Sequence, residues 1–174
     1  CNGGTWKLEG DTMIEKVEFD TKTPERVGSE VVFVVTITED EISIVGSDMV
    51  MKRIDNGTPG ELQGAWLMSG RVREGQTTEM RDTKRPRKTM KILSGTRFQW
   101  IAYNTETKEF MGTGGGVYTT IDGEYTETIE FFSRDDSRVG ASLKFNYSLV
   151  DGNWHHSGLS SKGDPIHEIW SIRE

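Results

Sequence analysis

Apolar and polar residues alternate with a period of two along most of the chain, which is the pattern of β-strands with one buried face. An early stretch places five apolar residues on one strand face, namely Val27, Val31, Phe33, Val35 and Ile37. The same spacing returns later at Val139, Leu143, Phe145, Tyr147 and Leu149. No segment longer than about ten residues shows helical periodicity. The sequence therefore predicts an all-β protein.

The two ends of the chain resemble each other when residue i is placed over residue i+112 without a gap. Between residues 3–46 and 115–158, 10 of 44 positions are identical. The identities include Gly4 over Gly116, Glu15 over Glu127 and Phe19 over Phe131. Self-similarity at a fixed offset indicates a repeated structural unit.

The offset also predicts the domain organisation. Residues 62–174 are about as long as the offset and are expected to form one complete unit. Residues 1–56 are expected to be the C-terminal part of an earlier unit with about five strands. Residues 57–61 form the linker, within a stretch rich in turn-forming residues.

Eight strands are predicted in the complete unit, near residues 62–72, 89–94, 96–104, 114–121, 124–132, 138–150, 153–158 and 166–173. Turn pairs such as Asp122-Gly123 and Asp151-Gly152 separate neighbouring strands. Eight antiparallel strands joined by hairpins suit an up-and-down β-barrel, whose closure removes exposed edges. A β-sandwich is the alternative architecture. The triple glycine at residues 114–116 lacks a following Gly-Lys-Ser/Thr, so it is interpreted as a strand kink and not as a phosphate loop.

Residues at the two ends of the complete unit support a more specific resemblance. Gly64-Ala65-Trp66 on the first strand and Glu168-Ile169-Trp170-Ser171-Ile172-Arg173 on the last resemble the signature of calycins, the lipocalin and fatty-acid-binding superfamily. The Gly-Gly-x-Tyr stretch and the Tyr125-x-Glu127-x-Ile129 strand further resemble lipocalin-like secreted proteins of Bacteroidetes, which are mostly of unknown function. The resemblance implies that Trp66 packs against Arg173 and closes one barrel end. The first unit departs from this pattern because it has no tryptophan where the second has Trp170.

The net charge of −7 argues against nucleic acid as a partner. Residues 71–91 nevertheless carry 8 of the 21 basic residues, in a long connection that includes Lys84-Arg85-Pro86-Arg87-Lys88. In fatty-acid-binding calycins the matching connection forms a lid, so this one is interpreted either as a basic lid that attracts an anionic amphiphile or as a solvated loop.

Glu127 is expected on the apolar face of its strand between Tyr125 and Ile129, and Glu15 repeats that arrangement. A buried carboxylate needs a partner or a proton. Glu127 is therefore expected to hold the polar end of a ligand, or to pair with Arg138 or a tyrosine hydroxyl.

The segment from Trp154 to His156 is expected to face Glu168 and Trp170 across a hairpin. If residues 154 and 170 are opposite, Trp154, His156, Glu168 and Trp170 share one face, and adjacent His155 points to the other. A Trp–Trp pair beside a satisfied histidine is favoured over a metal site, which needs three or four converging ligands. Neither a metal nor a cofactor is expected.

The preferred function is non-enzymatic binding of a small apolar or amphipathic ligand in the barrel. The candidate ligand-binding residues are Phe98, Trp100, Tyr118, Tyr125, Glu127, Trp154 and His156. One alternative is a filled barrel that serves as a scaffold for protein or polysaccharide interactions at the cell envelope. A more remote one is a hydrolase or isomerase that uses Glu127 or His156 as acid or base.

Cys1 is the single cysteine, so it forms no internal disulfide. A lipid anchor at Cys1 would suit a secreted, periplasmic or outer-membrane-associated protein, whereas its position inside the repeated unit favours a truncation point. No apolar run approaches the roughly 20 residues of a membrane helix. Five strands of an incomplete first unit leave open edges and an apolar face. We therefore expect completion by upstream sequence, by docking onto the barrel or by a second molecule in a homo-oligomer.

Overall fold

A computed structural model describes residues 1–55, 57, 60–73, 79–160 and 162–174 of the chain. Two compact units are present, the first made of residues 1–56 and 103–110 and the second of residues 57–102 and 111–174. No helix among the described residues is long and apolar enough to cross a membrane.

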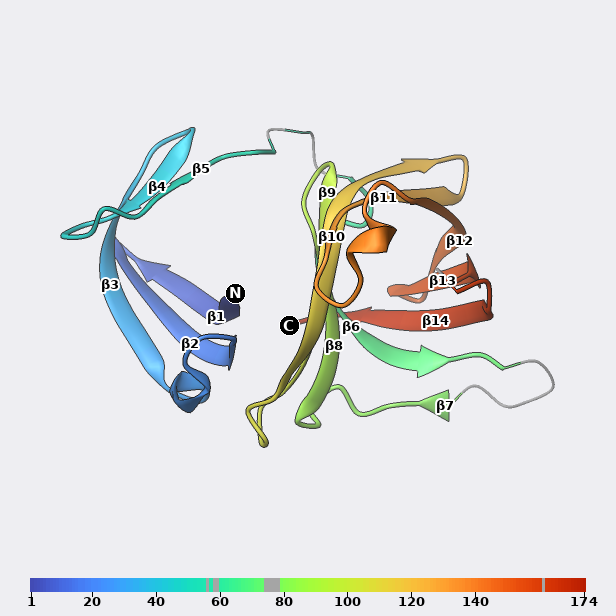
Figure 1. Ribbon diagram of the computed structural model, residues 1–174, viewed down its shortest axis with the longest axis horizontal. Helices are drawn as coiled ribbons and strands as arrows, with labels where there is room; N and C mark the ends of the chain where they lie inside the picture. Colours follow the sequence, from blue (N-terminus) through green and yellow to red (C-terminus); the bar gives the residue numbers. More distant parts are fainter. Residues whose placement is uncertain (56, 58–59, 74–78, 161) are drawn as a thin grey trace. The chain divides into compact units, whose positions relative to one another are not determined.

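The first unit contains a curled antiparallel sheet in which five strands follow one another in chain order (Figure 1). The strands are β1 (Asn2–Glu9), β2 (Thr12–Asp20), β3 (Glu30–Ile37), β4 (Glu41–Ile44) and β5 (Val50–Lys52). A single 3₁₀ turn, Pro24–Arg26, connects β2 to β3. The sheet therefore contains five strands, the number expected for residues 1–56.

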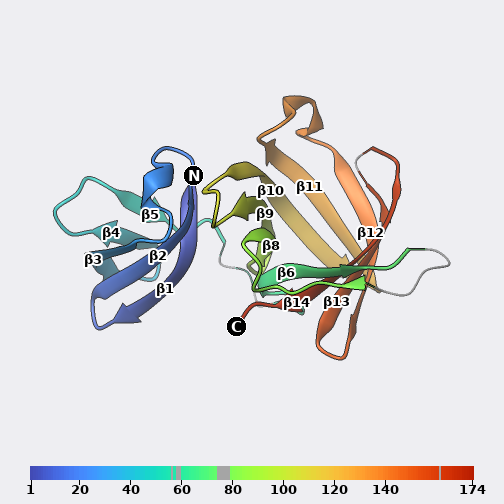
Figure 2. The same ribbon diagram turned by 90° about the horizontal axis from the view of Figure 1, so that it is seen from below.

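The second unit is a closed antiparallel barrel of eight strands, which confirms the predicted architecture. Its strands are β6 (Gly64–Arg71), β8 (Arg87–Leu93), β9 (Arg97–Asn104), β10 (Phe110–Ile121), β11 (Glu124–Phe132), β12 (Ser142–Val150), β13 (Asn153–Leu159) and β14 (Pro165–Ile172). The two-residue strand β7 (Glu79–Met80) flanks β6. The last strand pairs with the first, with Ser171 opposite Leu67 and Ile172 opposite Trp66. This pairing closes the sheet on itself and distinguishes a barrel from a sandwich (Figures 1 and 2).

Both units contain the same local structure at an offset of 112 residues. Strands β2 and β11 begin and end at residues that are 112 positions apart. The same holds for the 3₁₀ turns Pro24–Arg26 and Asp136–Arg138. The pairing of β1 with β2 shifts register between Gly3 and Gly4, and that of β10 with β11 shifts between Gly115 and Gly116. Identical residues at these positions therefore accompany identical strand geometry.

The glycine pair is required by close approach of the backbone, as the interpretation of a strand kink predicts. A Cβ atom on Gly116 would lie 2.0 Å from the carbonyl oxygen of Thr128, and one on Gly4 would lie 1.9 Å from that of Lys16. Only glycine leaves room for the neighbouring strand at such a bulge.

The long strand expected over residues 138–150 is shorter than the alternation suggests. It begins at Ser142, because residues 136–138 form a 3₁₀ turn and Gly140 adopts a φ of +88°. Val27 and Val139 therefore lie outside the strands in which the period-two pattern placed them. Apolar residues in a turn can extend an alternating pattern by chance, since the pattern carries no information on φ.

Aromatic residues dominate the barrel core. The buried cluster consists of Leu62, Trp66, Leu93, Phe98, Tyr118, Tyr125, Phe145, Trp154 and Trp170. These side chains come from every barrel strand, so the barrel is held together largely by ring packing.

Candidate functional site

The barrel interior brings together the residues that the sequence singled out. Phe98, Tyr118, Tyr125 and Trp154 lie in the core cluster, and Trp100 packs against it half-buried. Glu127 and His156 are buried among these rings, with 8% and 2% of their surface exposed. Side chains alternate between the inside and the outside of the barrel along each strand, and all seven candidates lie on the inner face or pack against it.

Lys91 is the charge at the centre of this cluster, and sequence reasoning did not name it. It projects from β8, where it pairs with Trp66 of β6, and it is 5% exposed. Its Nζ atom lies 5.1 Å from the ring centroids of both Tyr125 and Trp154. The rings of Phe98 and Trp170 lie at 5.9 and 5.5 Å. Four aromatic rings therefore surround the ammonium group at cation–π distance.

Glu127 neutralises this charge. Its Oε2 atom lies 3.3 Å from Lys91 Nζ and accepts a hydrogen bond of 3.1 Å from the hydroxyl of Tyr125. Of the two protein partners weighed for Glu127, the tyrosine hydroxyl is thus the one observed, while Arg138 forms an ion pair with Asp135. Burial raises the pKa of Tyr125 well above its usual value, and the charge of Glu127 adds to this.

His156 and Glu168 form a second polar pair. They are opposite on β13 and β14, with 3.7 Å between His156 Nδ1 and Glu168 Oε2. That distance is too long for a good hydrogen bond. Burial lowers the pKa of His156, and the nearby charge of Lys91 lowers it further, so the ring is neutral at neutral pH.

Glu168 stays ionised despite its surroundings. Burial alone raises its pKa, but the neighbouring His156 and Lys91 outweigh burial, so the pKa is lowered overall. Glu168 also forms an ion pair of 3.3 Å with Arg71, whose side chain is 44% exposed. Its negative charge is therefore stabilised by Lys91 within the cluster and by Arg71 on the solvent side.

Four buried nitrogen atoms of this cluster have no hydrogen-bond partner in the part of the chain that the structure describes. They are the indole Nε1 atoms of Trp154 and Trp170 and both ring nitrogens of His156. The two indoles belong to the predicted cross-strand pair, with ring centroids 5.8 Å apart. An unpaired buried donor costs about 1–3 kcal/mol, so these groups are suited to a partner that brings acceptor atoms.

Trp66 is buried, and its Nε1 donates to the carbonyl oxygen of Leu62 at 2.8 Å. The backbone N–H of Arg173 donates to the carbonyl oxygen of Ala65, and its guanidinium contacts the sulfur of Met90 at 3.2 Å. A contact between the guanidinium and the Trp66 ring stays a prediction.

His155 points away from the cluster, as expected for the neighbour of an inward residue. Its Nδ1 atom lies 3.1 Å from Nε2 of His167 on β14. Within the described residues, no group of three or more His, Cys, Asp or Glu side chains is arranged to hold a metal ion.

A small pocket of about 110 Å³ opens next to the His156–Glu168 pair. It is lined by Arg71, Val72, Arg73, Pro165, Ile166, His167 and Glu168. Because Ile166 packs against the core cluster, this pocket adjoins the barrel interior. The predicted basic lid begins here, but residues 74–78 lie outside the described part of the chain. Within the rest, Lys84, Arg85 and Arg87 are exposed.

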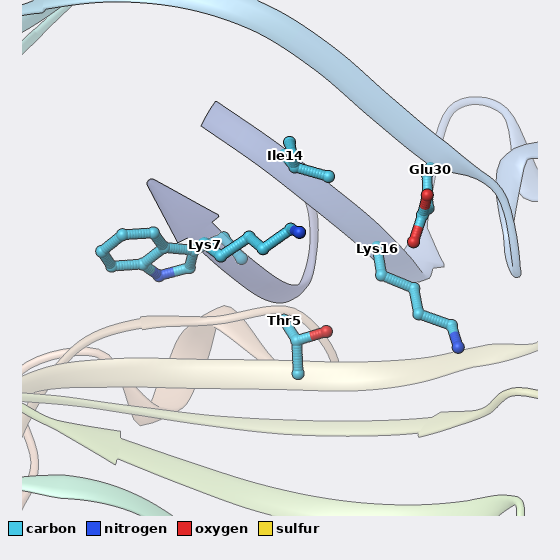
Figure 3. Close-up of a pocket in the computed structure, with 6 residues that line it drawn as sticks. Thr5, Lys7, Ile14, Lys16 and Glu30 are labelled. Atoms are coloured by element: carbon cyan, nitrogen blue, oxygen red, sulfur yellow. The ribbon is translucent and has the colours of Figure 1, made fainter. Parts of the chain in front are cut away.

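A larger pocket of about 190 Å³ lies on the first unit (Figure 3). It is lined by Thr5, Trp6, Lys7, Ile14, Lys16 and Glu30. Lys16 is opposite Glu30 and Lys7 opposite Ile14 in the strand register, so these four share one face of the sheet. The sequence signals did not single out this pocket.

A closed antiparallel barrel of eight strands with a buried polar cluster defines the class of this protein. The chain belongs to a family that is described only as a domain of unknown function (DUF4488), whose model matches residues 61–172. No curated protein matches the chain.

Two solved structures match part of this chain at low sequence identity. A lipocalin-like protein from Bacteroides uniformis ATCC 8492 is 14% identical with a TM-score of 0.46, over 66% of this chain and 100% of that one. An uncharacterized protein from Bacteroides eggerthii DSM 20697 is 13% identical with a TM-score of 0.42, over 63% of this chain and 98% of that one.

Proposed function

We propose that the barrel binds one small apolar or amphipathic molecule without chemically changing it. The observation that carries the proposal is the set of unpaired nitrogens on Trp154, Trp170 and His156, inside an otherwise aromatic wall. A filled structural core avoids unpaired buried donors, because apolar residues of similar shape would be at least as stable. Donors retained in an aromatic wall therefore favour a ligand that supplies the acceptors.

The surroundings of the cluster are also those of a binding site. Ligand sites in proteins combine a mostly apolar, aromatic lining with a few polar groups that orient the ligand. The pocket beside Glu168 is lined in part by residues of β14, the strand that also contains Trp170. The alternative of a filled scaffold lacks a comparable explanation for the unpaired donors.

Titration with the neutral fluorophore N-phenyl-1-naphthylamine tests this proposal. We expect saturable binding of one probe per chain, with increased probe fluorescence. Leu143 is half-buried against the core, so L143W should fill the interior and weaken binding. Trp6 is 65% exposed on the first unit, so W6A is the control and should bind as the parent does. Unchanged binding by a folded L143W variant would place the probe elsewhere and contradict the proposal.

We also propose that the first unit is part of a second copy of the same unit. The common register shifts, the common 3₁₀ turns and the 10 identities support a duplication. Grafting offers a test: residues 124–142 replaced by residues 12–30 should yield a folded barrel, since both segments contain the same strand and turn. An unfolded product would count against the duplication.

A further inference from the structure

The unpaired groups in the barrel specify which polar group a ligand should carry. An indole Nε1 donates and never accepts a hydrogen bond, so Trp154 and Trp170 both require an acceptor. Their rings lie side by side on β13 and β14. One carbonyl oxygen has two lone pairs and can accept from two donors at once. The neutral ring of His156 adds one donor and one acceptor to the same cluster.

Each charged side chain around these donors already has a partner of opposite sign. Lys91 is paired with Glu127 at 3.3 Å, and Glu168 with Arg71 at 3.3 Å. Glu127 and Lys91 are buried and the Glu168 side chain is 12% exposed, whereas Arg71 reaches solvent and its charge is screened. The buried part of the cluster thus contains two negative charges and one positive charge.

A charged ligand is disfavoured in either sign. An anion would add a third negative charge next to Glu127 and Glu168 in a poorly screened interior. A cation is attracted by aromatic faces, but Lys91 already occupies the centre of the four rings. An uncharged polar group avoids both costs and still satisfies the indole donors.

Building on the proposed function, we infer that the barrel selects an uncharged carbonyl compound, such as a ketone, ester or lactone with an apolar body. The carbonyl oxygen accepts from the indole N–H groups of Trp154 and Trp170, and the apolar body lies along the aromatic wall. Carboxylates of the same length are excluded by Glu127 and Glu168.

Competition against N-phenyl-1-naphthylamine at about pH 8, where a fatty carboxyl group is ionised, tests the inference. The competitors are 2-dodecanone and dodecanoate, which share a chain length and differ in charge. We expect 2-dodecanone to bind at least about tenfold more tightly than dodecanoate. W154F and W170F should each lower the affinity for 2-dodecanone several-fold more than they lower the affinity for the fluorophore.

W66F is the matched control, because the indole N–H of Trp66 is already bonded to Leu62 and should not contribute. A ratio of ketone to fluorophore affinity that is the same in W66F and in the parent supports the inference. Equal or tighter binding of dodecanoate, or an unchanged ratio in both W154F and W170F, overturns the inference and leaves the proposed function standing. Absence of any binding, the fluorophore included, overturns both.

Discussion

The Nζ atom of Lys91 lies 3.3 Å from Oε2 of Glu127, and the two side chains are only 7% and 10% exposed. These residues are 36 positions apart, on β8 and β11, so the ion pair links two non-adjacent strands across the barrel interior. Rings on β9, β11, β13 and β14 shield the pair from water. Each of the two buried charges is therefore stabilised mainly by the other.

Removing one partner of this pair should destabilise the barrel strongly. K91M leaves Glu127 as an uncompensated buried carboxylate, which should lower the free energy of unfolding by about 3–5 kcal/mol. The double variant K91M/E127Q removes both charges and should be more stable than K91M. Urea unfolding of the parent, both single variants and the double variant measures this coupling.

The exposed pair of Lys144 and Glu124 provides the control, since its side chains are 69% and 46% exposed. K144M should leave the urea midpoint nearly unchanged. A K91M variant as stable as K144M would mean that the buried pair contributes nothing to stability.

The depressed pKa of His156 predicts a loss of stability on mild acidification. Because the folded-state pKa lies below the unfolded value of 6.5, the unfolded chain takes up the proton first as the pH falls. Stability is therefore complete above pH 6.5 and decreases as the pH falls from there through the folded-state pKa. Glu168, whose pKa is lowered, adds a further loss only below its unfolded value of 4.5.

Unfolding free energies of the parent and H156Q, compared between about pH 7.5 and 5, isolate this contribution. The parent should lose more stability over this interval than H156Q. Burial and the neighbouring His155 also lower the pKa of His167. H167Q is therefore measured in parallel. The contributions of His156 and His167 to the loss of stability should add. Equal slopes for the parent and H156Q would show that His156 does not titrate in this interval.

Because of the bulge at Gly116, even an alanine side chain at this position should destabilise the fold strongly. A Cβ atom there would lie 2.0 Å from the Thr128 carbonyl oxygen and 2.8 Å from the Glu130 nitrogen, and backbone atoms cannot rotate away. G116A should lower the free energy of unfolding by about 3 kcal/mol. G152A is the comparison, because Gly152 has a φ of +76° and open space around it. The cost of G152A should be about 1 kcal/mol, that of the left-handed backbone alone. Equal thermal shifts for both variants would argue against the bulge.

Much of the fold follows from local pattern. Alternating apolar residues and turn dipeptides are short-range signals, so they predict most strands and the cross-strand pair of Trp154 and Trp170. The glycines at the bulges were also identified, because a repeated Gly-Gly pair lacked any other explanation. The start of β12 was missed, since a 3₁₀ turn depends on φ values that alternation does not reveal.

The centre of the candidate site was less predictable. Lys91 lies in the run Thr89-Met90-Lys91-Ile92-Leu93, where either face of the strand could be the buried one. Which face is buried depends on contacts with Trp66 and Glu127, which come from other strands. A signal was present in Leu93, which has the same parity as Lys91, is the last residue of β8 and lies in the core cluster. The preference for a lysine in the interior nevertheless arises only from tertiary contacts.

The most direct test of the central claim observes the indole N–H groups themselves. The chain has five tryptophans, so a ¹H–¹⁵N spectrum contains five indole signals that single Trp-to-Phe variants can assign. On titration with 2-dodecanone, we expect the signals of Trp154 and Trp170 to shift downfield as their donors gain an acceptor. The signal of Trp66, already hydrogen-bonded, and that of exposed Trp6 should stay in place. Unchanged Trp154 and Trp170 signals at saturating ligand, or a shift confined to Trp6, would contradict the account.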